Sequence, residues 1–186
     1  MLDAVAKIPL KDPDLFRQAN YIAGQWVQAD SGKTLPVRNP ASGEVIGTVP
    51  ALGAAETRRA IEAANAAYPA WRAMLAKDRA VVLHKLAALM HANADDLAAI
   101  MTAEQGKPLA ESKGEIAYAA SFIEWFAEEG KRIYGDTIPQ NAKGRRILVL
   151  KEPIGVFAAI TPWNFPIAMI TRKAGPGWAA GCTGVI

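Results

Sequence analysis

Residues 160–166, ITPWNFP, stand between a short apolar run and a segment with helical spacing, and they decide the fold predicted for this chain. The run before them, residues 155–160, is apolar throughout and flanked by prolines, which is typical of a strand buried on both faces. After it, Asn164 is a favoured N-cap type and Pro166 suits the first turn of a helix. A strand that leads directly into a helix places its turn at the carboxyl edge of a parallel sheet, where open α/β folds bind ligands. We therefore expect ligand contacts from Thr161, Trp163 and Asn164.

Phe165, Met169 and Arg172 are spaced i, i+4, i+7 and so share one face of the expected helix. This face is an apolar wall that ends in a cation. It suits a substrate with a reactive end near Asn164, a short aliphatic body and an anionic tail that an arginine binds through two hydrogen bonds. The alternative is an ordinary capped helix whose arginine faces solvent. The spacing alone slightly favours this alternative.

The same stretch carries a family resemblance. Together with AMITRKAGP at 168–176 and AAGCT at 179–183, it resembles the aldehyde dehydrogenase superfamily and is most similar to the succinate-semialdehyde dehydrogenase branch. Supporting stretches occur in order along the chain: NPASGEVIGTVP at 39–50, EQGKPLAESKGEI at 104–116 and YAASFIEWFAEEGKRIYGDTIP at 118–139. An ordered match from about Tyr21 onward is far more specific than any single motif.

This resemblance implies roles for individual residues. Asn164 matches the asparagine whose side-chain amide helps to form the oxyanion hole. Phe165 and Met169 match the walls of the aldehyde tunnel, and Arg172 matches an arginine that holds the substrate carboxylate. The residues that match the nicotinamide cofactor site are Ile160, Thr161, Pro162, Trp163 and Asn164.

The resemblance also implies an activity, which is oxidation of succinate semialdehyde to succinate with NAD or NADP in the full-length relatives. Other branches, acting on glutarate semialdehyde or another aldehyde, stay open, as does the choice between NAD and NADP. The family mechanism needs a cysteine nucleophile and a glutamate base from later segments, so this chain is expected to be an amino-terminal fragment or truncated product, inactive by itself. A non-catalytic oligomerisation or binding fragment is the alternative from a different class.

Composition and charge exclude several classes of protein. The 186 residues contain 21 Lys and Arg against 18 Asp and Glu, and this small, dispersed excess predicts no nucleic-acid partner. A single cysteine excludes an internal disulfide and fits a reducing compartment. The chain lacks an apolar run of about eighteen residues, and its start has neither a hydrophobic core nor the composition of a targeting signal. A cytoplasmic protein without a membrane partner is therefore expected.

An α/β fold in three parts is expected, namely the amino-terminal part of the aldehyde dehydrogenase fold with an incomplete Rossmann-like cofactor domain. Residues 1–132 form the first part of the cofactor-binding domain, 133–152 an oligomerisation arm, and 153–186 the beginning of the parallel-sheet core. Within the first part, a loosely held lead-in over residues 1–20, with a possible helix at 14–18, precedes a small antiparallel flap. The strands of this flap are expected at 21–28, 33–38 and 44–49.

Three long amphipathic helices are expected after the flap. The first begins at Ala54 and is bent or ended by Pro69. The second runs from near Asp78 to Gly106, and the third follows from Pro108 to Gly130. The apolar face of the first helix comprises Ile61, Ala64, Tyr68 and Trp71, and that of the second begins with Val82, Leu86, Leu89 and Met90.

Residues 133–138 and 146–150 are expected to pair as a hairpin. Its second strand contains ILVL at 147–150, which suits pairing with another chain better than exposure at an edge. The resemblance agrees, because family members extend such an arm to a neighbouring subunit, and it implies a homo-oligomer, a dimer or a tetramer. The alternative is a hairpin buried within its own chain.

Several conspicuous residues are interpreted as structural. His84 and His91 are seven residues apart, about 10.5 Å along a helix, which is too far for one metal ion, and no metal site is expected. Cys182 is interpreted as a small buried hydrophobe instead of a nucleophile. Gly175, Gly177 and Gly181 have the wrong spacing for a dinucleotide fingerprint, so packing explains them better. Gly177-Trp178 and Gly184 depart from the family pattern, which suggests relaxed constraint or a sequence error.

Overall fold

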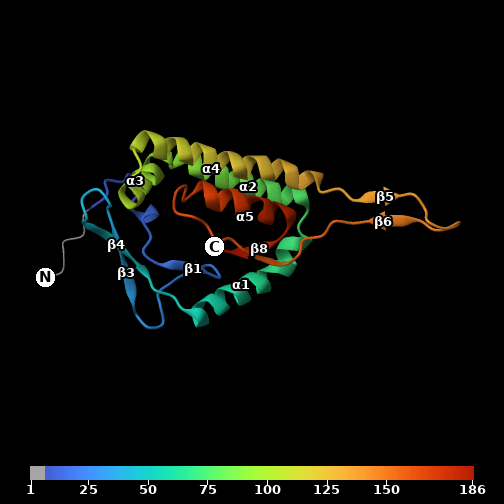
Figure 1. Cartoon of the computed structure of the whole chain (residues 1–186), viewed down its shortest axis with the longest axis horizontal. Coiled ribbons are helices and arrows are strands. Elements are labelled where there is room, and N and C mark those ends of the chain that lie inside the picture. Colours follow the sequence, from blue (N-terminus) through green and yellow to red (C-terminus); the bar gives the residue numbers. More distant parts are fainter. Residues whose placement is uncertain (1–6) are drawn as a thin grey trace.

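The parallel pair formed by strands β7 (Val156–Ala158) and β8 (Thr183–Val185) lies between two layers of helix. In the computed structural model, which describes residues 7–186, α5 (Ala168–Ala180) contacts the pair from one side and α1 (Ala54–Ala73) from the other (Figure 1). Helix α5 is in turn covered by α4 (Leu109–Glu129) and α2 (Ala76–Ala92). The expected strand, turn and helix are therefore present, and the fold is of the α/β class.

Helix α1 is tied to the strand layer and to α5 by three side-chain hydrogen bonds. The Tyr68 hydroxyl donates to the carbonyl of Pro153 at 2.6 Å, and the Trp71 indole N–H donates to the carbonyl of Trp178 at 3.0 Å. From the strand side, the Thr183 hydroxyl donates to the α1 carbonyl of Ala64 at 2.7 Å. Three of the four residues expected on the inner face of α1 are thus at this contact, whereas the fourth, Ile61, is 46% exposed.

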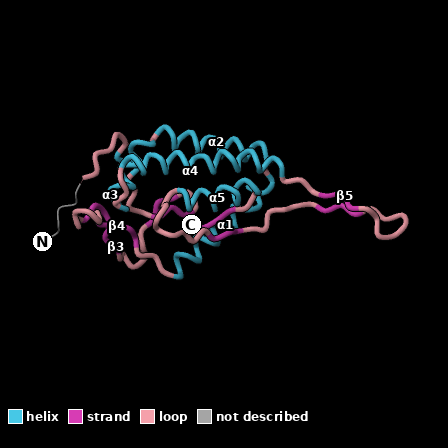
Figure 2. The backbone as a smooth tube through the Cα atoms, turned by 45° about the horizontal axis from the view of Figure 1, so that its top comes forward, coloured by secondary structure: helices cyan, strands magenta, loops and turns pink. Residues whose placement is uncertain are grey.

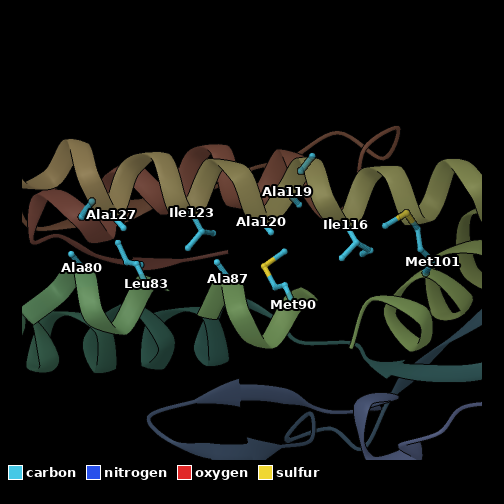
Figure 3. Packing of buried hydrophobic residues seen from close by; sticks show 13 residues of the cluster. Ala80, Leu83, Ala87, Met90, Met101, Ile116, Ala119, Ala120, Ile123 and Ala127 are labelled. Carbon is cyan, nitrogen blue, oxygen red and sulfur yellow. The ribbon is translucent and has the colours of Figure 1, made fainter. Parts of the chain in front are cut away.

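The core lies between α2 and α4, and alanines form much of it (Figure 3). Small side chains let the two helix backbones approach closely, while Ile116 and Ile123 of α4 fill the remaining space and are fully buried. The buried face of α2 contains Leu83, Ala87 and Met90. The expected face was therefore wrong in part, because Val82 and Leu89 are exposed. The buried face of α2 is the one that contains Ala87.

The observed helices differ from the expected ones in two places. Helix α1 does not end at Pro69, which was one of the two outcomes expected there, but continues to Ala73. The second expected helix is two helices, α2 and α3 (Ala94–Gln105), separated at Asn93. Asn93 leaves the helical conformation, and its side chain donates at 2.9 Å to the carbonyl of Leu89, which also accepts the backbone N–H of Asn93 at 3.1 Å.

The expected flap is two separate two-stranded sheets. Its first predicted strand is a hairpin of β1 (Asn20–Ile22) and β2 (Gln25–Val27), because Ala23 and Gly24 both have positive φ, 51° and 82°, and reverse the chain. The second sheet pairs β3 (Thr34–Arg38) with β4 (Val45–Pro50), antiparallel as expected.

The lead-in is held more firmly than expected from residue 7 onward, and its first six residues lie outside the described part. Backbone N–H groups of Lys11 and Asp12 donate to the carboxylate of Asp96 at 3.0 and 2.8 Å. The Lys11 ammonium also pairs with Asp95 at 3.0 Å. In place of the helix expected at 14–18, a short 3-10 turn covers Pro13–Leu15.

Acid is expected to weaken this attachment through Asp95. The pKa of the Asp95 carboxyl falls to about 2 because Lys113 and Lys11 donate hydrogen bonds to it and attract its charge. A carboxyl whose folded pKa is depressed stabilises the fold above its unfolded pKa, so this contribution is lost as the pH falls from about 4 toward 2. Asp95→Asn should flatten the dependence of the urea-unfolding free energy on pH over this range. Asp136→Asn is the matched control, because Asp136 is an exposed acid of strand β5.

The arm hairpin of β5 (Asp136–Ile138) and β6 (Ile147–Val149) extends away from the rest of the chain (Figures 1 and 2). Leu148 and Leu150 are 68% and 70% exposed. The hairpin was therefore predicted correctly, and the alternative of a hairpin buried within its own chain was wrong.

Gly177, Gly184 and Trp178 are explained by one aromatic side chain. The Phe157 ring lies over both glycines: a Cβ atom added to Gly177 would be 2.5 Å from Phe157 Cε1, and one added to Gly184 would overlap the same ring. The Trp178 ring packs beside it, with ring centroids 6.4 Å apart. The departures from the family pattern thus form one packing unit, so the interpretation as relaxed constraint or error is not needed.

Neither a membrane span nor a metal cluster is found between residues 7 and 186. No helix there combines the length and the apolar composition that crossing a bilayer requires, and no three potential metal ligands gather. The two histidines of α2 pair instead with acids of α4, His84 with Glu128 at 2.7 Å and His91 with Glu124 at 3.6 Å.

Candidate functional site

The turn over residues 160–166 leaves the carboxyl end of β7 and leads into α5. Strand β7 is still paired as the turn begins, because the N–H of Ala159 donates to the carbonyl of Val185 at 2.8 Å. Helix α5 begins at Ala168 with Ile167 as its N-cap residue. The expectation that Asn164 caps the helix was therefore wrong, and Pro166 lies before the helix instead of in its first turn.

Helix α4 supplies the cap that Asn164 does not. The Glu115 side chain is 1% exposed, and its Oε1 accepts hydrogen bonds from the backbone N–H groups of Ile167 at 3.0 Å and Ala168 at 3.2 Å. The other oxygen, Oε2, accepts a hydrogen bond from the Lys107 ammonium. A carboxylate here satisfies two of the free N–H groups of α5 and faces the positive end of its dipole.

Lys107 connects this cap to the turn. Besides Glu115, its Nζ donates to the backbone carbonyl of Asn164 at 3.2 Å and lies 4.2 Å from the centre of the Phe165 ring. An ammonium over an aromatic face is attracted by the ring quadrupole. Three contacts of one cation thus hold the turn against the start of α4.

The turn presents most of its side chains outward. Ile160 and Trp163 are 87% and 80% exposed, Pro162 and Asn164 are exposed, and Thr161 is half-buried. Within residues 7–186 the Asn164 side-chain amide forms no hydrogen bond, so its donors are free to bind a ligand.

A groove of about 250 Å³ lies beside Phe165, between the turn and α4. We call it the α4–turn groove, and its lining residues are Lys107, Glu111, Gly114, Glu115, Tyr118 and Phe165. The Tyr118 ring packs on Phe122 with centroids 4.7 Å apart. The Arg172 guanidinium lies over the Phe122 ring of this pair, 5.3 Å from its centre. A line of aromatic rings therefore leads from the turn toward Arg172.

The structure brings the predicted wall residues together only in part. Arg172 lies next to Met169, with 4.0 Å between Nη1 and Sδ, as their spacing predicts. Phe165 lines the groove, and no carboxylate of residues 7–186 pairs with Arg172. The aromatic wall from α4 was missed, although Gly114, Tyr118 and Phe122 are spaced four residues apart and so share one face.

Residues 26–186 match the sequence profile described as the aldehyde dehydrogenase family. The chain belongs to this family. It is 69% identical to a glutarate-semialdehyde dehydrogenase of Pseudomonas putida and 64% identical to the NADP(+) succinate-semialdehyde dehydrogenase of Escherichia coli, each over 95% of the chain. A crystal structure described as an E. coli NADP-dependent enzyme superposes with a TM-score of 0.94, again at 64% identity and over 95% of the chain. In all three comparisons the chain spans 37% of the relative's length.

The one cysteine of this aldehyde dehydrogenase chain lies away from the turn. Cys182 is 6% exposed and follows Gly181, the C-cap residue of α5, whereas the turn precedes the other end of that helix. Its neighbour Arg79 donates to the carbonyl of Ala179 at 3.1 Å, and burial lowers the pKa of this guanidinium. The position of Cys182 therefore agrees with its interpretation as a small buried hydrophobe.

Proposed function

We propose that this chain forms the part of an NAD(P)-dependent semialdehyde dehydrogenase that binds the substrate carboxylate, the reacting oxygen and one edge of the cofactor. One observation carries the proposal. Within residues 7–186 the Arg172 guanidinium has no carboxylate partner and lies 5.3 Å from the centre of the Phe122 ring, whereas the exposed Asn164 adjoins Phe165, which lines the groove together with Tyr118. A short aldehyde with a distal carboxylate has its two polar ends in the same arrangement.

Arg172 is proposed to hold the substrate carboxylate. A guanidinium binds a carboxylate through two parallel hydrogen bonds, and that of Arg172 lies over the Phe122 ring. The names of the two relatives agree with this chemistry, because succinate and glutarate semialdehyde each carry a carboxylate and differ by one methylene. The proposed substrate class is therefore a short aldehyde with a carboxylate at its other end.

Asn164 is proposed to stabilise the negative charge that develops on the aldehyde oxygen when its carbon is attacked. An amide donor that is already in place does not have to reorganise during the reaction, so it stabilises the transition state more than the substrate. The backbone of Asn164 is held by Lys107 while its side chain stays free.

The residues of the turn fit one edge of a nicotinamide cofactor. Ile160 and Trp163 offer exposed apolar surface, and Thr161 adds a hydroxyl group, at the carboxyl end of a parallel strand where open α/β sheets bind dinucleotides. The chemistry that a bound nicotinamide supplies is acceptance of a hydride. The turn is proposed to orient this group and to exclude water from one side of it.

The carboxylate role is tested in a chimera in which residues 1–186 replace the matching part of the E. coli relative. Arg172→Gln should raise KM for succinate semialdehyde by roughly 10- to 100-fold, as expected for a lost pair of charge-assisted hydrogen bonds, with little change for butanal. Lys173→Gln is the matched control, because Lys173 is the next residue along the helix and donates to the carbonyl of Met169 at 3.4 Å. Equal effects of Arg172→Gln on both aldehydes would remove the carboxylate role.

For the 186-residue chain alone, a non-catalytic associating module is the second candidate. The exposed leucines of β6 and the loop after it favour it, together with the burial of the only cysteine. The isolated chain serves as a further control in the same assay. NADP+ reduction by it would contradict this second candidate.

A further inference from the structure

The ion pair between Lys107 and Glu115 is buried beside the turn, where its stability contribution does not explain it. Their side chains are 9% and 1% exposed. Removing two charges from water is costly, and replacing a buried ion pair by apolar residues is often neutral for stability. A role in fixing geometry is the better explanation, because both groups also bond to backbone atoms of the turn and α5.

The pair holds the backbone on both sides of Phe165 and Pro166. Before them, the carbonyl of Asn164 accepts a hydrogen bond from Lys107, and after them the N–H groups of Ile167 and Ala168 donate to Glu115. Lys107 precedes α4 and Glu115 lies within it. The turn is thereby fixed to α4, which carries the aromatic wall of the groove.

The pair also occupies the charge of Lys107. The Lys107 charge is matched by Glu115, by the Asn164 carbonyl and by the Phe165 ring, so Lys107 offers no free charge at the reactive end of the groove. Within the described residues 7–186, Arg172 has no carboxylate partner and lies over the Phe122 ring. A carboxylate is thus directed to the Arg172 end and the aldehyde to the Asn164 end.

We propose that Lys107 and Glu115 are positioning residues that set the direction of the Asn164 amide relative to the groove. The inference rests on the proposed function of Asn164 as an oxyanion donor. Neither residue needs to touch the reacting atoms, because both act through the backbone of the turn.

The kinetic test uses the chimera with Lys107→Met, which keeps most of the length of the side chain and removes its charge. We expect kcat for succinate semialdehyde to fall by about tenfold or more, with KM for aldehyde and for NADP+ within about twofold, since a misplaced donor weakens transition-state binding most. Lys113→Met is the matched control: it also removes a lysine–carboxylate pair, to Asp95 at 2.8 Å, but on an exposed face. A Lys107→Met chimera with unchanged kcat would overturn the proposal.

A second variant, Glu115→Gln, keeps the oxygen that caps α5 and removes the charge that holds Lys107. It is expected to lower kcat less than Lys107→Met does. If Glu115 served only as the helix cap, both Glu115→Gln and Lys107→Met would keep full turnover. That outcome would contradict the proposal.

A double variant tests whether the pair acts through Asn164. In an Asn164→Ala background, Lys107→Met should lower kcat by less than twofold, because the donor that it positions is already gone. Independent, multiplicative losses would show that Lys107 acts on something else and would overturn the inference.

Amide hydrogen exchange in the 186-residue chain separates this inference from the proposed function. Glu115→Leu should speed exchange at Ile167 and Ala168 by about tenfold or more, as for a lost charge-assisted hydrogen bond, and should affect Leu83 in the core much less. Unchanged exchange at Ile167 and Ala168 would overturn the positioning role. If exchange there is faster and an Asn164→Ala chimera keeps full turnover, the proposed function of Asn164 is contradicted. The role of Glu115 in attaching the turn to α4 is then still supported.

Discussion

Replacing Gly184 by alanine is expected to destabilise the layer of β7 and β8 strongly, unless Phe157 is shortened in the same variant. The added methyl group would overlap the Phe157 ring, and at Gly177 it would be 2.5 Å from Phe157 Cε1. Forcing extra volume into a packed site costs about 1–3 kcal/mol, and more where neighbours are fixed. The ring is fixed here, because Trp178 packs against it and the Trp178 carbonyl accepts a hydrogen bond from Trp71.

The measurement is the free energy of urea unfolding for Gly184→Ala, Phe157→Ala and the double variant. Each single variant should be less stable than the parent chain, by overpacking in the first and by a cavity in the second. The double variant should be more stable than the sum of the two losses predicts, because the methyl group enters the space that the ring leaves. Additive losses would contradict the packing unit.

Gly114→Ala is the matched control for these variants. Gly114 is an exposed glycine within α4, and a Cβ atom there would meet nothing within 4 Å. Alanine at this position should therefore raise stability by up to about 1 kcal/mol through helix propensity. A loss of stability in Gly114→Ala as large as in Gly184→Ala would mean that glycine replacement itself, and not the Phe157 ring, is responsible.

The fold class could be predicted from the sequence because its signals are local. The apolar run, the prolines and the helical spacing around residues 160–166 identify a strand, a turn and a helix, and all three are present. The start of α5 could not be predicted in this way. Its cap comes from Glu115, more than fifty residues earlier in the chain, whereas capping rules describe only neighbouring residues.

The inner face of α2 was mispredicted for a related reason. The expected face was chosen from large apolar residues at helical spacing, such as Val82 and Leu89, yet both are exposed. The buried position Ala87 belongs to the face that allows close approach to α4, where Ala120 is equally buried. Close packing between helices is decided by the fit of both surfaces, which one helix alone does not reveal.

The candidate site was predictable only along α5. Met169 and Arg172 are adjacent because their spacing on one helix requires it. The contribution of α4, through Tyr118 and Phe122, depends on the packing of two helices that are far apart in sequence. The i, i+4 spacing of these aromatics was a usable signal, but the spacing does not say which helix they face.

Asn164→Ala in the chimera is expected to lower kcat for succinate semialdehyde by roughly 10²-fold or more, the loss typical of a missing oxyanion donor. The affinity for NADP+ should change little, because the amide is proposed to act on the aldehyde oxygen. Turnover and NADP+ binding, the latter followed by quenching of tryptophan fluorescence, are measured on the same preparation. Asn141→Ala, in the loop of the arm hairpin, is the control and should leave both unchanged.

The structure also removes the competing explanation for a loss of activity in this variant. Replacing a true N-cap residue by alanine typically costs about 1 kcal/mol of stability, but α5 begins at Ala168 and takes its cap from Glu115. Asn164→Ala should therefore keep the melting temperature and the helical circular dichroism of the parent chimera. Lower turnover at unchanged stability would identify the amide as a catalytic donor, whereas full turnover would show that the reaction does not use it.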